Sequence, residues 1–237
     1  MFRKTAARTD HPTPATRRRA LLRRGLGWLR WLVLRALVVM LVLVGLFALV
    51  NPPTTITIAR EATEPRQWTR LADISPVLAR SVVAAEDANF CHHWGFDMVE
   101  IRRVIDSGGR RGASTITQQT AKNLYLWQSR SWTRKALETL LTPMIEALWS
   151  KRRILEVYLN IAEFGDGVFG IHAAAAHYFG TTPDRLTATQ SARLAAVLPA
   201  PKLRNPRQSR RSAAIADGAA TILRDGRAAC FTLPARD

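Results

Sequence analysis

Cysteine is scarce in this sequence of 237 residues, which contains only Cys91 and Cys230. Two cysteines so far apart exclude a zinc ribbon and the framework of a disulfide-rich domain. A single bridge between them can form in an oxidising compartment, but the sequence does not show whether the two backbones lie close enough. The pairing of the two cysteines is therefore left open.

Acidic residues are also few. The chain has 18 Asp and Glu against 35 Lys and Arg, which gives a formal net charge of +17 at pH 7. Such a balance favours anionic partners: nucleic acid, phospholipid headgroups or phosphate-bearing substrates. Residues 1–35 hold ten basic groups and one acid, so about half of the excess charge lies in an N-terminal tail. The other half belongs to the rest of the chain and needs its own explanation.

The sequence shows little β pattern, no internal repeat and no second domain. From Ser75 onwards, apolar residues recur at helical spacing between local start and stop signals. One short stretch, residues 54–58 (TTITI), can form a brief strand. The fold class predicted is mainly α. The start and stop signals are Ser75 with Pro76, Asp97, Thr115 with Gln118, Ser150, Gly180, and Thr187 with Gln190.

A long apolar run lies near the N-terminus. Residues 31–50 are long enough for a helix that crosses a bilayer, and Asn51-Pro52-Pro53 ends it. A cleaved signal peptide is the alternative, but the basic tail is long and no small-x-small cleavage site follows. Because basic residues precede the span, we expect residues 1–30 in the cytoplasm, and a connecting segment, 51–74, and a domain, 75–237, outside. That topology argues against nucleic acid as a partner.

Three segments are candidates for chemistry. Glu86 and Asp87 end an apolar helix beside Phe90, where burial raises a carboxyl pKa and suits acid or base catalysis. Taken alone, two solvated acids at a helix end explain this pattern better. Residues 112–123 form a small-residue loop that leads into a helix, an arrangement that suits an anionic ligand. It lacks the spacing of a nucleotide P-loop, and a plain capped helix explains it equally well.

The third segment is a basic cluster that contains acids. It can bind pyrophosphate, although a surface salt-bridge pair explains each residue singly. Cys91-His92-His93 has no matching metal ligands downstream, so no metal site is predicted. The cluster consists of Arg130, Arg134, Lys135, Glu138 and Glu146.

Together these segments resemble the peptidoglycan glycosyltransferases, glycosyltransferase family 51. Five stretches match the motifs of that family in order, and their amino-acid sequences most resemble those of the monofunctional, single-span members. Ala113 replaces a more usual glycine and Leu137 a lysine found in some members. The stretches are Glu86-Asp87-x-x-Phe90-x-x-His93-x-Gly95-Phe96-Asp97, residues 112–123 (GASTITQQTAKN), Arg134-Lys135-x-x-Glu138, Lys151-x-x-Ile154-Leu155-Glu156-x-Tyr158-Leu159-Asn160, and residues 174–180 (AAAHYFG).

The resemblance implies a lysozyme-like helical domain that polymerises lipid II into glycan strands, with inversion and release of undecaprenyl pyrophosphate. Glu86 matches the catalytic base and Glu138 a second essential acid. Positions matching Lys122, Arg130 and Arg134 neutralise the pyrophosphate. Ser114, Gln118 and Gln119 match its polar lining.

The resemblance also implies a place and partners. We expect a single-pass protein of the cytoplasmic (inner) membrane, with a periplasmic catalytic domain and with other cell-wall synthases and division proteins as candidate partners. No cofactor is required, although some members respond to a divalent ion, which leaves Mg²⁺ or Mn²⁺ open. The rival hypotheses are a lytic enzyme of the same fold, which would need no pyrophosphate site, and a non-catalytic anchored scaffold, which would need neither Glu86 nor Glu138.

Overall fold

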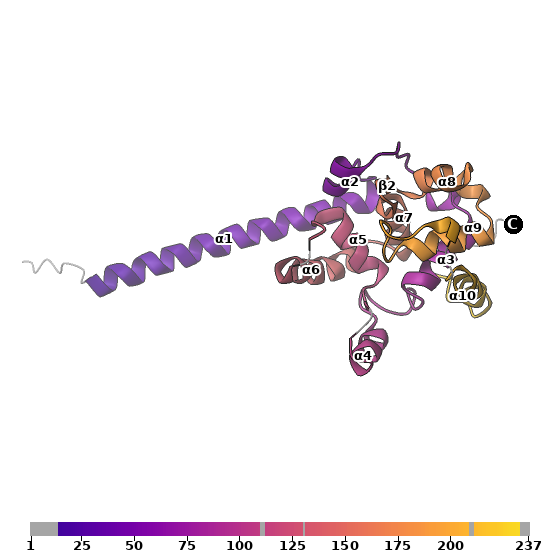
Figure 1. Cartoon of the computed structure of the whole chain (residues 1–237). Coiled ribbons are helices and arrows are strands. Elements are labelled where there is room, and N and C mark those ends of the chain that lie inside the picture. Colours follow the sequence, from indigo (N-terminus) through magenta and orange to yellow (C-terminus); the bar gives the residue numbers. More distant parts are fainter. Residues whose placement is uncertain (1–13, 110–111, 130, 209–210, 233–237) are drawn as a thin grey trace, which may run out of the picture. The chain divides into compact units, whose positions relative to one another are not determined.

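The computed structural model describes residues 14–109, 112–129, 131–208 and 211–232 (Figure 1). This part of the chain consists of helices, with one short β-hairpin, which confirms the mainly α prediction. It divides into two compact units, one that extends to Leu43 and one that begins at Val44.

The first unit is most of helix α1, Pro14–Leu49. Within α1, the stretch Arg23–Leu49 is long and apolar enough to cross a membrane, which is compatible with a single-pass anchor. The end of α1, from Val44 onwards, is counted with the second unit. There the buried Val44 accepts a hydrogen bond of 2.8 Å from Nε1 of Trp149, and Arg153 donates to the carbonyl of Phe47.

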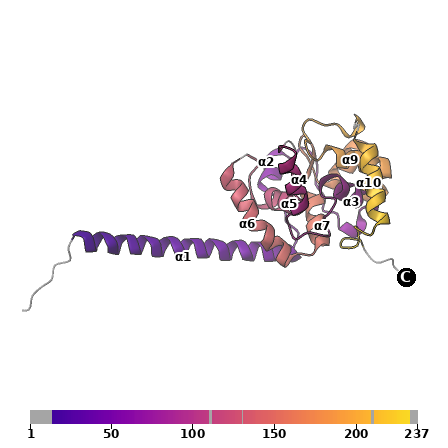
Figure 2. The same cartoon turned by 90° about the horizontal axis from the view of Figure 1, so that it is seen from below.

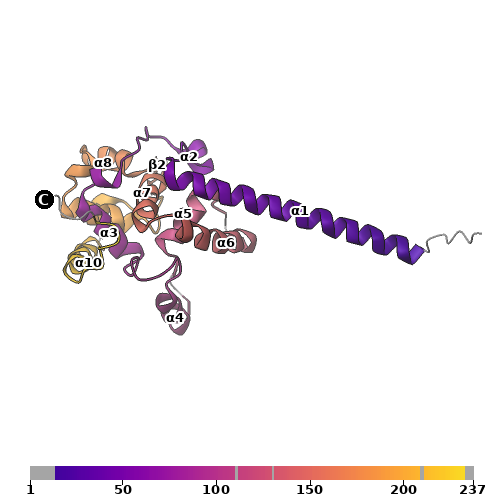
Figure 3. The ribbon, with the colours of Figure 1, turned by 180° about the vertical axis from the view of Figure 1, so that it is seen from behind.

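The second unit packs its helices in two groups. In one group α3, α9 and α10 contact one another, and Figures 1 and 2 show them side by side. In the other, α5 contacts both α6 and α7, as Figure 3 shows from behind. The elements are α2 (Ile56–Glu61), η1 (Leu71–Asp73), α3 (Pro76–Glu86), α4 (Met98–Asp106), α5 (Ile116–Tyr125), α6 (Trp132–Leu148), α7 (Lys151–Ile161), β1 (Glu163–Gly165), β2 (Val168–Phe169), α8 (Ile171–Phe179), η2 (Pro183–Arg185), α9 (Ala188–Val197), η3 (Pro206–Gln208) and α10 (Ser212–Arg224).

Most of the predicted helix ends are confirmed. Asp97 and Ser150 accept backbone N–H groups at the starts of α4 and α7, and Thr115 and Thr187 each form a capping box. Gly180 ends α8 in the left-handed conformation. Ser75 does precede Pro76 at the start of α3, but its hydroxyl donates to the carbonyl of Leu186 instead of capping the helix. Local side-chain chemistry thus sets most of these boundaries.

The prediction of a brief strand at residues 54–58 is wrong, because α2 begins there. The hydroxyl of Thr55 accepts a hydrogen bond of 3.2 Å from the backbone N–H of Ile58 and so caps the helix. Thr57 and Ile58 are buried in the second unit. Capping and burial outweigh the β preference of threonine and isoleucine, which is small and depends on context.

The glycine-rich segment after α7 forms a two-stranded antiparallel hairpin from β1 and β2. Gly167 lies in its turn with a φ of +72°, a conformation that favours glycine. A Cβ at Gly167 would lie 2.5 Å from Oγ1 of Thr63, and the N–H of Thr63 donates to the carbonyl of Gly167. The close approach of the connecting segment therefore also requires glycine.

Candidate active site

Glu86 is the last residue of α3, at the end of an apolar helix as predicted. One carboxylate oxygen, Oε2, accepts a hydrogen bond of 2.8 Å from the side-chain amide of Gln119 on α5. The other oxygen, Oε1, is buried and has no hydrogen-bond partner among the residues that the structure describes. The carboxylate is thus held in place through one oxygen, Oε2, by the side chain of Gln119.

The surroundings of Glu86 favour its neutral form. Burial raises the pKa of Glu86, and the adjacent Asp87 also raises it; the hydrogen bond from Gln119 and the positive charges of Arg211 and Arg204 oppose this effect. A carboxyl group whose pKa lies above its ordinary value takes up a proton more readily near neutral pH. These surroundings suit a general base.

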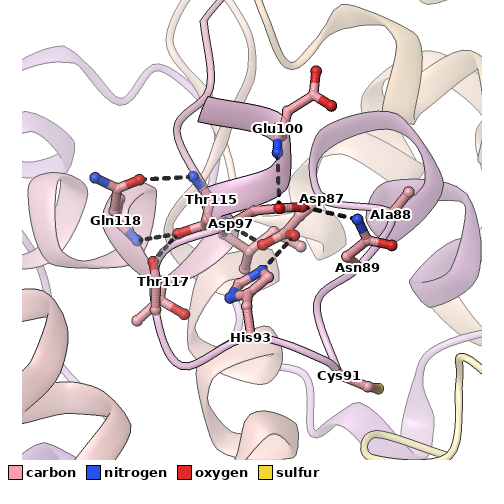
Figure 4. A network of polar contacts seen from close by, with 12 residues as sticks. Asp87, Ala88, Asn89, Cys91, His93, Asp97, Glu100, Thr115, Thr117 and Gln118 are labelled. Carbon is pink, nitrogen blue, oxygen red and sulfur yellow. Dashed lines mark hydrogen bonds and ion pairs between the residues drawn. The ribbon is translucent and has the colours of Figure 1, made fainter. Parts of the chain in front are cut away.

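Asp87, by contrast, serves the fold (Figure 4). Its carboxylate accepts hydrogen bonds of 2.7 Å from Nε2 of His93 and 2.9 Å from the backbone N–H of Ile116, the first residue of α5. Asp97 caps α4 through Val99 and Glu100, and the side chain of Asn89 also donates to it. These bonds join the loop after α3 to the starts of two helices.

Asp87, His93 and Asp97 also lie close enough to hold a metal ion, since one ligand atom of each is within 4.8 Å of the others. Their chemistry does not fit one well. Oδ1 of Asp87 bonds directly to the imidazole, and oxygens of both carboxylates accept backbone N–H groups at helix starts. An ion would have to displace these bonds, so we assign the three residues to the fold.

Glu138 and its cationic partners lie on α6. Glu138 is buried, and its two oxygens accept from Arg134, at 2.7 Å, and from the ammonium group of Lys135. Lys122 on α5 interacts electrostatically with Glu138 and Glu86. Burial lowers the pKa of Lys122 and the positive charge of Arg134 lowers it further, whereas the negative charges of Glu138 and Glu86 raise it. The structure therefore brings three cations and two carboxylates into one region. Arg130, also predicted here, lies outside the described residues.

The predicted polar lining divides into different roles. Gln118 is buried, and its side-chain oxygen accepts from the backbone N–H of Thr115 to complete the capping box of α5. Gln119 faces Glu86 instead, and Ser114 lies half-buried in the loop before α5. The structure thus places Gln119 beside Glu86 and gives Gln118 a local capping role.

The hydrogen bonds that the buried Glu146 makes to neighbouring helices were not predicted from the sequence. Glu146 on α6 accepts hydrogen bonds of 2.6 Å from Thr117 and 2.7 Å from Lys151, and Lys151 also donates to the carbonyl of His93. Three helices and the loop after α3 are thus joined through three side chains. Thr117 and Lys151 lie in two of the matched motifs, which was the available signal, but only the fold pairs them with Glu146.

Comparison with known proteins agrees with this geometry. The family model described as Transglycosylase matches residues 54–225, a family whose fold is lysozyme-like. A biosynthetic peptidoglycan transglycosylase of Jannaschia sp. (strain CCS1) is 55% identical over 201 residues, which cover 81% of this chain and 84% of the relative. Proteins of the same name from Salmonella paratyphi B and Salmonella typhi are each 47% identical over 196 residues, 74% of this chain and 81% of theirs. The chain belongs to the transglycosylase family.

Proposed function

We propose that this protein is a peptidoglycan glycosyltransferase that polymerises lipid II into glycan strands. The observation that carries the proposal is the pairing of a half-buried base, Glu86, with a cationic cluster. Lys122 interacts electrostatically with both Glu86 and Glu138, and Glu138 in turn pairs with Arg134 and Lys135. A base that lies near a group of positive charges suits an inverting transfer from a pyrophosphate.

In the proposed step, the carboxylate of Glu86 takes the proton of the 4-hydroxyl of the acceptor glucosamine. The acceptor oxygen forms a bond to C1 of the donor muramyl sugar as the bond from C1 to the pyrophosphate oxygen breaks. The electron pair of that bond leaves with undecaprenyl pyrophosphate. Because attack and departure occur on opposite faces, the configuration at C1 inverts.

The cationic cluster stabilises the leaving group. Lys122 and Arg134 supply positive charge where the pyrophosphate gains negative charge, and we keep Arg130 in the same proposed role. Both oxygens of Glu138 are engaged by Arg134 and Lys135, so Glu138 acts by holding these cations in place. Ser114 and Gln118 remain proposed parts of the polar lining, with Gln118 acting through the start of α5.

Two observations support the proposed location, a single pass in the cytoplasmic membrane with the catalytic unit in the periplasm. The basic residues precede the apolar part of α1, which is typical of a tail that stays in the cytoplasm. Cys91 and Cys230 form a disulfide in the second unit, and disulfides persist in oxidising compartments. Other cell-wall synthases and division proteins are proposed partners, and nucleic acid is not.

The proposal includes no resident cofactor, because side chains supply the positive charge at the leaving group. A divalent ion, Mg²⁺ or Mn²⁺, would then act by accompanying the pyrophosphate of the substrate. Polymerisation that persists in EDTA supports this view. Binding of Mg²⁺ or Mn²⁺ to the purified protein without lipid II contradicts it, because the ion would then be resident.

The test is incorporation of labelled lipid II into polymer by the purified full-length protein in detergent. We expect Glu86→Gln to lower the rate by about 10²- to 10⁴-fold, the usual contribution of a general base. Glu64→Gln is the matched control, because Glu64 pairs with His177 at the surface and is not among the groups that shift the pKa of Glu86. No polymer from the folded parent with lipid II bound would refute the proposal and favour the scaffold. Cleavage of intact sacculi would favour the lytic enzyme.

A further inference from the structure

Tyr158 on α7 is fully buried and is connected to Glu86 through the side chain of Gln119. Its hydroxyl lies 3.0 Å from Oε1 of Gln119, and Nε2 of the same amide lies 2.8 Å from Oε2 of Glu86. Three helices thus contribute to one short chain of hydrogen bonds, from α7 through α5 to the end of α3. The family motifs contain all three residues, but only the fold joins them.

The direction of these hydrogen bonds follows from the chemistry of the groups. An ionised carboxylate can only accept, so the amide nitrogen of Gln119 must face Glu86. The amide oxygen then faces Tyr158, whose hydroxyl must donate. Burial raises the pKa of Tyr158 well above its ordinary value, and the nearby Glu86 and Asp87 raise it further. The phenol therefore keeps its proton and remains a donor over the working pH range.

We propose that Tyr158 is a positioning residue for catalysis: its hydroxyl fixes the amide of Gln119, which in turn holds Oε2 of Glu86 and so sets the orientation of the carboxylate. This inference rests on the proposed function. Gln119 gives the only hydrogen bond to the Glu86 carboxylate among the described residues, because Oε1 has no partner there.

The hydroxyl of Tyr158 can be separated from its ring. The ring is part of the core, where phenylalanine would keep the same packing, so Tyr158→Phe removes the donor alone. The amide of Gln119 then loses its second anchor and can turn its oxygen towards Glu86. The hydrogen bond that Gln119 gives lowers the pKa of Glu86, so weakening it raises that pKa further.

The experiment measures kcat and KM against pH for the full-length protein in detergent with lipid II. We expect Tyr158→Phe to lower kcat about tenfold near neutral pH, the effect of one net hydrogen bond, to leave KM unchanged, and to move the acid limb of kcat to higher pH. The matched control is Tyr125→Phe: the Tyr125 hydroxyl is also buried but has no hydrogen-bond partner among the described residues. The proposal is overturned if Tyr158→Phe has the same kcat and the same acid limb as the parent. It is also overturned if the loss of kcat equals the fraction of the variant that is unfolded.

A double-mutant cycle tests the path of the effect. In a Gln119→Leu background, Tyr158→Phe should have no further effect on kcat, since the amide between the two groups is gone. Independent, multiplicative losses would overturn the proposal. The carboxyl ¹³C NMR signal of Glu86 gives its pKa without turnover, and we expect a higher value in Tyr158→Phe than in the parent. An unchanged pKa refutes the positioning role itself, whereas an inactive parent refutes the proposed function.

Discussion

Breaking the disulfide between Cys91 and Cys230 should have a large effect on stability. The bridge joins two residues 139 positions apart, with Cα atoms 5.6 Å from each other. In the chain-entropy model, a loop of this length restricts the unfolded chain by about 5 kcal/mol at 25 °C. Measured effects usually fall below the model, so we expect Cys91→Ser with Cys230→Ser to lower the free energy of unfolding by about 3–5 kcal/mol.

The folded state should survive this change, because other contacts hold the C-terminal segment. Phe231 is buried, with its ring centroid 6.3 Å from that of Phe90, and its carbonyl accepts a hydrogen bond of 3.3 Å from Arg152. Ala228 is buried as well. The double variant should therefore keep its activity at low temperature while it unfolds at lower denaturant concentration.

The assay is urea unfolding in mild detergent, followed by tryptophan fluorescence. Cys230→Ser alone should match the double variant, since either change opens the loop, and a reductant should lower the midpoint of the parent but not that of the double variant. Equal free energies of unfolding for the parent and the double variant would refute the reasoning. That result would mean that the unfolded chain gains no freedom when the loop opens.

Three further changes, one of them with its own control, test the site and its support. Burial raises the folded-state pKa of Glu86, so the parent protein loses stability as the pH rises from about 4.3, the pKa in the unfolded chain, through the folded-state pKa. Glu86→Gln should therefore raise Tm at pH 7 but not at pH 4. Equal Tm values for variant and parent at pH 7 contradict this reasoning. Gly95→Ala should cost about 2–4 kcal/mol in chemical denaturation, because φ is +82° and the new Cβ would lie 2.6 Å from a threonine methyl group. Gly226→Ala, with φ of +75° and open space, should cost only about 1–2 kcal/mol, and equal costs would exclude the clash. Glu138→Gln should abolish polymerisation and cost about 1–3 kcal/mol in thermal unfolding, because two cations lose their buried acceptor; full activity would remove it from the site.

The helix boundaries could be read from the sequence because capping is local. The capping side chains accept hydrogen bonds from backbone groups two or three residues away, a spacing that the sequence alone reveals. They are Asp97, Thr115, Ser150 and Thr187. The short segment 54–58 was misjudged because its preference for a strand is weak and its burial depends on the rest of the unit. Context of that kind leaves no local pattern.

The candidate acids could also be predicted, but their separate tasks could not. Glu86 and Asp87 are neighbours with similar side chains, and what distinguishes them is a hydrogen bond from Ile116, 29 residues away. Gln118 and Gln119 differ in the same way: one faces the start of its own helix and the other faces Glu86. The fold therefore determines which of two adjacent side chains is hydrogen-bonded to a backbone group and which faces the candidate site.

The same distinction shows how the matched motifs act together. Several of their polar side chains are engaged with one another or with the buried Glu146: Lys151 and Thr117 with Glu146, His93 with Asp87, and Arg134 with Glu138. These bonds hold α5, α6, α7 and the loop after α3 against one another around the site. Glu86 lies at the end of α3 beside this network and is tied to α5 through Gln119. Neighbours that are themselves held by hydrogen bonds keep such a group in reacting geometry without further reorganisation.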